Sequence, residues 1–223
     1  MKKPRDTPKD PKTKKYEEFS AGNLEDAITK VVKLIANLST EEQYAQVNLL
    51  NEKETIQMLI STLVQAIDKR TIDKNEEFIL NAISCITNIL FYDIPQKELL
   101  NNDIRTSIFN SIKLYILATQ NEEIQIETVR VLSNLSRHAV LCNEFVNDST
   151  FLEALTVVLD HTLRDLVFYS VGIIINITLH EESRQRILEK DIVIPKLIDV
   201  LRDSNIEDID LSKVAAKALH NMT

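Results

Sequence analysis

Four histidines come nearest to a metal-binding or catalytic set in this sequence: His138, His161, His180 and His220. No two of them stand four residues apart, the spacing that would bring a pair to one metal ion on a helix. His180 opens the run HEESR, which lacks the second histidine of a zinc-protease motif. We therefore expect the histidines in loops or turns and predict no metal site.

Acidic pairs are plentiful, and two carboxylates could in principle support acid–base catalysis. Here the pairs recur where helices are expected to begin, at Glu41-Glu42, Glu76-Glu77, Glu122-Glu123 and Glu181-Glu182. Negative charge at a helix start is favourable because it opposes the positive end of the helix dipole. The sequence therefore predicts a protein with no enzymatic activity, no cofactor and no small-molecule substrate.

Asparagine is the polar residue that recurs at regular spacing. It occupies the fourth position of LIANLS, CITNIL, VLSNLS, IIINIT and ALHNMT. These five anchor asparagines, separated by 51, 46, 42 and 45 residues, are Asn37, Asn88, Asn134, Asn176 and Asn221. A recurrence of about 40 to 47 residues is typical of stacked helical repeats.

Apolar residues accompany every anchor asparagine at three fixed positions: five residues before it, two before it and one after it. These positions lie along one stripe of a helix. A single repeat cannot bury such a stripe alone, so neighbouring repeats must cover it. The fifteen predicted core residues are Val32, Ile35, Leu38, Ile83, Ile86, Ile89, Val129, Leu132, Leu135, Val171, Ile174, Ile177, Ala216, Leu219 and Met222.

We predict three helices in each repeat, with the anchor asparagine and its apolar stripe on the third helix. The repeat domain is predicted to cover residues 21–223. The units are predicted to end near Ser39, Leu90, Ser136, Thr178 and Thr223. The first unit keeps only its third helix, with Asn23 as N-cap, and the second begins near residue 41. The later units predict helices over 95–100, 104–118, 124–136, 140–146, 151–159, 166–179, 183–189, 194–201 and 211–222.

Residues 1–20 carry three prolines among seven lysines and arginines, so they are predicted to form a disordered basic tail. Only two glycines occur in 223 residues, which disfavours hairpins and phosphate-binding loops. The net charge of −8 argues against nucleic acid, and no apolar stretch approaches the ~20 residues of a membrane span. Cys85 and Cys142 fall inside helical patterns and are expected to be buried, reduced thiols of a cytoplasmic protein.

A three-helix unit ending in Asn-Leu-Ser, as in KLIANLS and ETVRVLSNLS, resembles the armadillo repeat. The resemblance implies an all-α, right-handed solenoid of about four to five repeats whose third helices line a concave protein-binding surface. Within this family, the sequence most resembles the carboxy-terminal repeats of a member that belongs to motile cilia. That implies a scaffold or adaptor for assembling or carrying axonemal components, radial spokes in particular. A permanent axonemal subunit and a general cytoplasmic adaptor remain alternatives.

Import receptors with this repeat carry a tryptophan one turn before each asparagine, where this chain has Lys33, Ser84, Arg130, Gly172 and Lys217. The chain has no tryptophan, so we do not expect it to bind basic localisation signals in that way. Lys33, Arg130 and Lys217 could instead form a basic stripe for an extended acidic segment, or simply a solvated face. The anchor asparagines could contact that segment's main chain or brace the turns between repeats.

Overall fold

The computed structural model describes residues 11–40, 52–204 and 208–223, with side chains from residue 22 onward. These ranges are helical throughout apart from turns and one isolated bridge between Ile94 and Lys97. The helices up to the middle of the chain are α1 (Pro11–Thr40), α3 (Lys53–Asp68), the 3-10 turn η2 (Ile72–Lys74), α4 (Glu76–Tyr92), α5 (Asn102–Ile112), α6 (Tyr115–Ala118) and α7 (Glu122–Leu135). Those that follow are α8 (Ala139–Asn147), α9 (Ser149–Val158), α10 (Arg164–Thr178), α11 (Glu181–Leu188), α12 (Val193–Asp203) and α13 (Ile209–Asn221).

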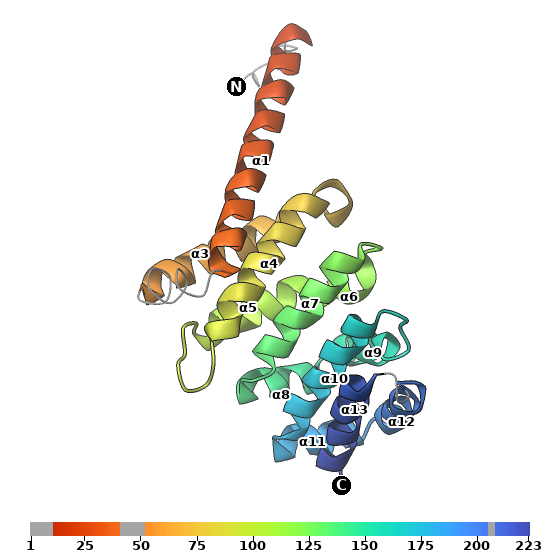
Figure 1. Cartoon of the computed structure of the whole chain (residues 1–223). Coiled ribbons are helices and arrows are strands. Elements are labelled where there is room, and N and C mark those ends of the chain that lie inside the picture. Colours follow the sequence, from red (N-terminus) through yellow and green to blue (C-terminus); the bar gives the residue numbers. More distant parts are fainter. Residues whose placement is uncertain (1–10, 41–51, 205–207) are drawn as a thin grey trace, which may run out of the picture.

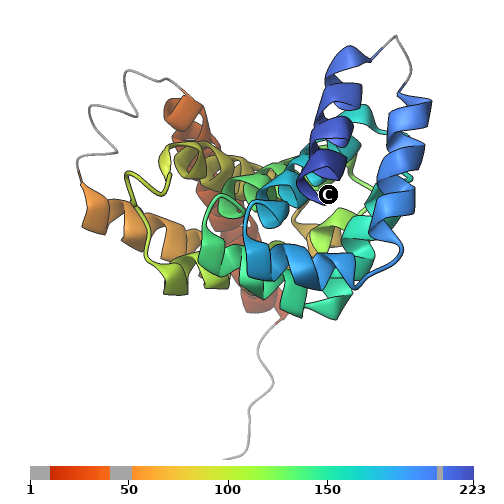
Figure 2. The ribbon, with the colours of Figure 1, turned by 90° about the horizontal axis from the view of Figure 1, so that it is seen from below.

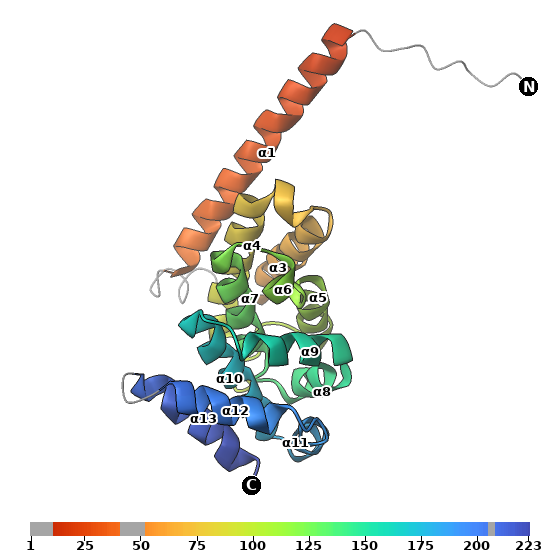
Figure 3. The same cartoon turned by 90° about the vertical axis from the view of Figure 1, so that its right-hand side faces the viewer.

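The five helices that carry the anchor asparagines, α1, α4, α7, α10 and α13, pack side by side in chain order (Figure 1). We call them the third helices. The remaining helices lie behind them, and the stack curves so that the third helices follow its inner side (Figures 2 and 3). This arrangement is the predicted all-α solenoid. Within the described part of the chain, no helix is both long and apolar enough to cross a membrane.

Side-chain caps fix where several helices begin. Asn101 accepts a hydrogen bond from the Ile104 amide at the start of α5, and Asn121 accepts from the Ile124 amide at the start of α7. Asp148 and Asp208 cap α9 and α13 in the same way. Each cap satisfies an amide that the helix itself leaves unpaired.

The core is continuous along the stack, as the apolar stripe predicts. All nine stripe residues of the three middle units are buried: Ile83, Ile86, Ile89, Val129, Leu132, Leu135, Val171, Ile174 and Ile177. In the first and last units the predicted burial of the stripe is less complete, because each of these third helices is covered by a neighbouring third helix on one side only. Val32 is buried and Ile35 partly so, whereas Ala216 is exposed.

The amino-terminal predictions need correction. Residues 1–10 lie outside the described residues, but the chain is helical from Pro11, so residues 11–20 are not the disordered tail that their composition predicts. Proline suits the first turn of a helix, and no other proline or glycine interrupts the run before Gly22. Asn23 lies inside α1 and is not its N-cap. The predicted start of the second unit falls within residues 41–51, outside the described ranges.

The predicted helix over residues 95–100 is wrong, and the predicted helix over 104–118 is divided into α5 and α6. Residues 95–100 form a loop because the buried Asp93 carboxylate accepts hydrogen bonds from the backbone amides of Leu99 and Leu100, at 2.7 and 3.2 Å. Those amides are therefore committed to a side chain, which competes with helix formation.

Candidate functional site

The anchor asparagines form a ladder between successive third helices. Asn88 Nδ2 donates to the Ala36 carbonyl at 3.2 Å and to Ser39 Oγ at 3.1 Å, both in the preceding unit. Asn176 donates likewise to Ser136 Oγ, at 2.8 Å, and to the carbonyl of Ser133. The amide nitrogens thus brace the stack.

Two more anchor asparagines donate to the preceding unit, and Asn37, in the first unit, does not. Asn134 donates to the Thr87 carbonyl at 3.3 Å, and Asn221 donates to Thr178 Oγ1 at 3.2 Å. Asn37 is exposed, and its side chain enters no hydrogen bond among the described residues. The four bracing asparagines are only partly buried and use their nitrogens, which leaves each amide oxygen for a ligand amide.

The three predicted basic residues lie on third helices, but two of them already have acidic partners. Lys33 pairs with Glu77 at 3.5 Å, with both side chains largely exposed. Arg130 pairs with Glu127 on its own helix. Lys217 is exposed and enters no ion pair among the described residues. The basic stripe is therefore partly neutralised.

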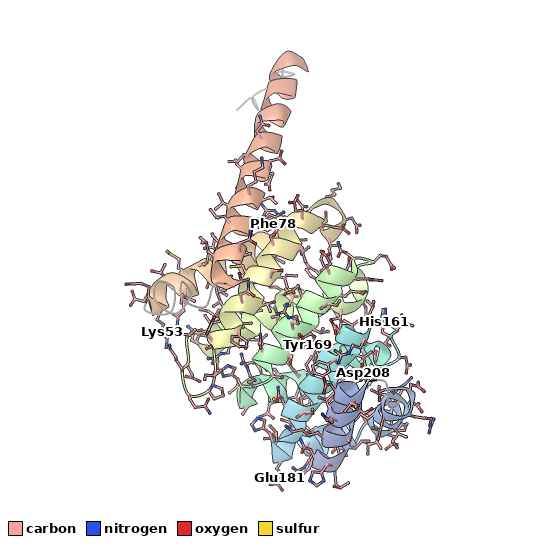
Figure 4. The ribbon with its side chains drawn as sticks, viewed as in Figure 1. Lys53, Phe78, His161, Tyr169, Glu181 and Asp208 are labelled. Carbon is pink, nitrogen blue, oxygen red and sulfur yellow. The ribbon has the colours of Figure 1, made fainter. Side chains whose placement is uncertain are left out.

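Two hollows run along the inner side of the stack, and together we call them the third-helix groove. The first lies between α4, α7 and α10 and is lined by Thr40, Asn88, Phe91, Tyr92, Arg130, Ser133, Asn134 and Tyr169 among others. The second lies between α1, α4 and α7 and is lined by Asn37, Asn81, Ser84, Asn88, Ile126, Glu123 and Glu127 among others. Tyr169 lies near the middle of this face (Figure 4).

Arg130 lines the first hollow of the groove and lies beside an aromatic ring and a carboxylate. The Arg130 guanidinium lies 5.8 Å from the centre of the Tyr169 ring. Its partner Glu127 binds it through Oε1, while Glu127 Oε2 is buried without a hydrogen-bond partner among the described residues. A buried acceptor without a donor is costly, so this oxygen would gain from a ligand donor.

Gly172 lies on α10, one turn before Asn176. A Cβ atom placed on it would meet Ser133 Oγ at 3.4 Å, which is ordinary contact. Packing among the described residues therefore does not require glycine here.

The structure contains a buried polar cluster that the sequence pattern did not predict. Asp93 binds Arg105 through Nε at 2.8 Å and Nη2 at 3.0 Å, and His138 Nε2 lies 3.1 Å from the Asp93 carbonyl. Burial alone would raise the pKa of Asp93, but hydrogen bonds from His138, Arg105 and two backbone amides hold it well below its usual range. The sequence signal was weak, because one Asp, one Arg and one His stand in three separate segments.

Arg137 is a second residue that the sequence did not reveal. Its guanidinium donates to the carbonyls of Leu90, Phe91 and Asp93, which end α4. Burial lowers the pKa of Arg137, and the Asp93 charge acts in the opposite direction. Arg137 thereby fixes the position of Phe91, whose exposed ring forms one wall of the groove.

The buried thiols fit a structural role. Burial raises the pKa of Cys85 and of Cys142 to about 12, although a hydrogen bond with Ser39 acts against the shift at Cys85. Neither thiol would ionise near neutral pH. In the described ranges, no group of three or more His, Cys, Asp or Glu side chains is placed to hold a metal ion.

Comparison with known proteins supports the repeat assignment. No protein-family model matches the sequence. The chain is 26% identical over 213 residues to armadillo repeat-containing protein 2 of Mus musculus, covering 96% of this chain and 24% of that protein. The human protein of that name is 28% identical over 208 residues, covering 89% and 22%. The chain thus spans about a quarter of the length of the relatives it matches.

Two solved structures that share the fold of this chain are designed proteins. A computationally designed armadillo repeat protein for modular peptide recognition superimposes with a TM-score of 0.66 and 22% identity, over 89% of this chain and 77% of that one. A designed armadillo repeat protein in complex with the peptide (KR)4 gives a TM-score of 0.64 and 22% identity, over 89% and 76%. The chain therefore has the armadillo-repeat fold and is similar along about nine-tenths of its length to armadillo repeat-containing protein 2.

Proposed function

We propose that this chain is a non-enzymatic scaffold that holds an extended segment of another protein along the third-helix groove. The observation that carries the proposal is the row of anchor asparagines along the groove: Asn37, Asn88 and Asn134 line its two hollows, and their amide oxygens accept no hydrogen bond among the described residues. An extended peptide has main-chain amides that lack partners until it is bound. The similarity to a designed protein that binds the peptide (KR)4 supports the same use of the fold.

The segment is proposed to be acidic at the units that carry Arg130 and Lys217. Arg130 lines the first hollow of the groove, with Tyr169 beside it. Lys217, on the third helix α13, lies outside both hollows and enters no ion pair within the described ranges. Arginine with aromatic neighbours is the composition of interaction hot spots. Lys33 would contribute at the first unit once its exposed pair with Glu77 opens, which costs little.

A second candidate, a basic segment, is favoured by one specific observation. Glu127 Oε2 is buried without a donor among the described residues and lines the groove together with Glu123. A lysine or arginine of the partner would supply the missing donor.

Two labelled peptides of opposite charge, (DE)4 and (KR)4, distinguish these candidates by fluorescence anisotropy. If the partner segment is acidic, we expect (DE)4 to bind with an affinity that falls as salt is added. This binding should be lost when Lys33, Arg130 and Lys217 are all changed to Glu. The matched control changes three exposed lysines, Lys53, Lys69 and Lys190, to Glu; they lie at the ends of the outer helices α3 and α11 and not on a third helix. Binding of (KR)4 that is lost in Glu123→Gln/Glu127→Gln would favour the basic candidate. If neither peptide responds to groove variants, charged-peptide binding in the groove is wrong.

We further propose that the scaffold serves the assembly or transport of axonemal components in motile cilia, such as radial spokes. The support is the resemblance to armadillo repeat-containing protein 2 over most of this chain. A permanent axonemal subunit and a general cytoplasmic adaptor are the alternatives. Detergent extraction of cilia carrying the tagged protein separates them: an assembly factor is released with the soluble fraction, a permanent subunit stays in the axoneme, and a general adaptor is not enriched in cilia.

A further inference from the structure

The two hollows of the third-helix groove differ in charge. The first is lined by the cation Arg130 and, among the described residues, by no carboxylate. The second is lined by the carboxylates of Glu123 and Glu127 and, in the described part of the chain, by no lysine or arginine. Both hollows are lined by Thr40 and Asn88, so they adjoin each other. A ligand that lies across both would therefore meet an acidic and a basic environment.

The two hollows are offset along the axes of the third helices. On α7, Glu123 precedes Arg130 by seven residues, which is about 10 Å of helix. The neighbouring helix α4, beside α7 in Figure 1, shows the same offset, since it lines the second hollow from Leu80 onward and the first from Thr87 onward. The charge of the groove therefore changes sign across its width.

The ion pair between Arg130 and Glu127 lies at the boundary, with one partner in each hollow. It joins Arg130 Nη1 to Glu127 Oε1. The other two guanidinium nitrogens bond no described residue, and Glu127 Oε2 also lacks a partner within the described ranges. Each member of the pair therefore keeps polar atoms for a second ion, so the pair does not cancel the charge difference between the hollows.

Glu123 adds a carboxylate that nothing balances. It is exposed and forms no ion pair among the residues that the structure describes. It lies four residues before Glu127 on α7, a spacing at which two like charges on one helix face oppose each other. A cation in the second hollow would relieve this repulsion.

We infer that the partner segment is dipolar: a basic side chain occupies the second hollow, beside Glu123 and Glu127, and an acidic side chain occupies the first, at Arg130. This inference rests on the proposed function and assigns both charges to one segment. An extended chain advances about 3.3 Å per residue, so the two side chains are about three residues apart. Such a segment matches the order of charge in the groove, which is how interfaces fix register.

Four labelled peptides of eight residues test the inference by fluorescence anisotropy: KRKRDEDE, DEDEKRKR, (KR)4 and (DE)4. The first two are mixed peptides, given in both orders because a bound chain has a direction. We expect one mixed peptide to bind about tenfold more tightly than either uniform peptide. It gains both ion pairs and avoids the repulsion that each uniform peptide meets in one hollow.

Two groove variants should give a crossed pattern. Arg130→Gln should weaken the preferred mixed peptide and (DE)4 but strengthen (KR)4, because Glu127 loses its partner within the chain. Glu123→Gln/Glu127→Gln should weaken the same mixed peptide and (KR)4 but strengthen (DE)4. A variant that had merely lost its fold would bind every peptide more weakly, so the pattern separates charge from structure.

Exposed residues on the outer helices provide controls with the same change in charge. Arg202→Gln on α12 matches the arginine variant, and Glu153→Gln/Glu189→Gln, on α9 and at the end of α11, matches the glutamate variant. Both should bind all four peptides as the parent does.

Two results would overturn the inference while leaving binding in the groove intact. One is a mixed peptide that binds no more tightly than the better uniform peptide. The other is a mixed peptide that responds to only one of the two groove variants. If no peptide responds to either groove variant, the proposed function is itself wrong and the inference falls with it.

Discussion

At the scale of single residues, four of the five anchor asparagines brace the stack through their amide nitrogens. Their nitrogens brace the stack, as the bonds from Asn88 and Asn176 show, while their oxygens remain for a ligand. The sequence left bracing and ligand contact as alternatives. The structure shows bracing directly, and ligand contact stays a proposal.

Replacing Asn176 by Ala should therefore lower the free energy of unfolding by about 1 kcal/mol, the net value of a typical intramolecular hydrogen bond. Asn37→Ala should change it little, because that amide makes no bond within the described chain. Urea unfolding of both variants measures the difference. Equal losses would show that the hydrogen bonds of the ladder are not what stabilises the stack.

The buried Asp93–Arg105 pair should be costly to break. Arg105→Ala leaves a carboxylate buried without its main partner, and we expect a loss of about 3–5 kcal/mol. Arg202→Ala removes a pair that is exposed on both sides and should cost no more than about 1 kcal/mol. A small loss for Arg105→Ala in denaturant unfolding would contradict the role of the cluster.

Acid should remove the contribution of Asp93. Its pKa is lower in the folded than in the unfolded chain, so ionisation stabilises the fold above about pH 4, the ordinary carboxyl range. That stabilisation is lost as the pH falls through the lower, folded value. The melting temperature of the parent should therefore fall toward that of Asp93→Asn on acidification. A difference between them that stays constant from about pH 7 to about pH 3 would count against this assignment.

At the scale of helices, the sequence predicted most of the third helices because each repeats one pattern around asparagine. It failed where tertiary contacts overrode local pattern. Residues 95–100 look like a helix after Pro95, but their amides bind the buried Asp93 carboxylate instead. Of the residues predicted from spacing, Asn37, Asn88, Asn134 and Arg130 line the groove, and their contact with a partner stays a prediction. Glu127, Arg137 and Phe91 were not predicted, because their positions depend on neighbouring units.

Gly172 offers a test of the groove within one helix. Alanine at this position should stabilise α10 by up to about 1 kcal/mol, since the new methyl group fits at ordinary contact distance from Ser133. If a bound segment approaches this backbone closely, Gly172→Ala should raise the melting temperature and weaken binding of the peptide that the groove prefers. Unchanged binding would remove Gly172 from the proposed site.

At the scale of the whole molecule, the core is one continuous layer shared between units, and the inner face is left to polar and aromatic residues. The core and the proposed binding surface therefore lie on different sides of the same helices. Leu132→Ala, which empties space between units, should cost about 2–5 kcal/mol without touching the groove. A loss below about 1 kcal/mol in urea unfolding would be inconsistent with this shared core.

Binding of partners along the third-helix groove can be tested by site-specific photo-crosslinking. A photoreactive amino acid at Ser84 would lie in the groove, and one at Met58 would lie on the outer helix α3. With the peptide that the groove prefers, we expect covalent adducts from position 84 and none from position 58. Adducts from position 58 alone would place the binding surface on the outer side of the stack and rule out binding in the groove.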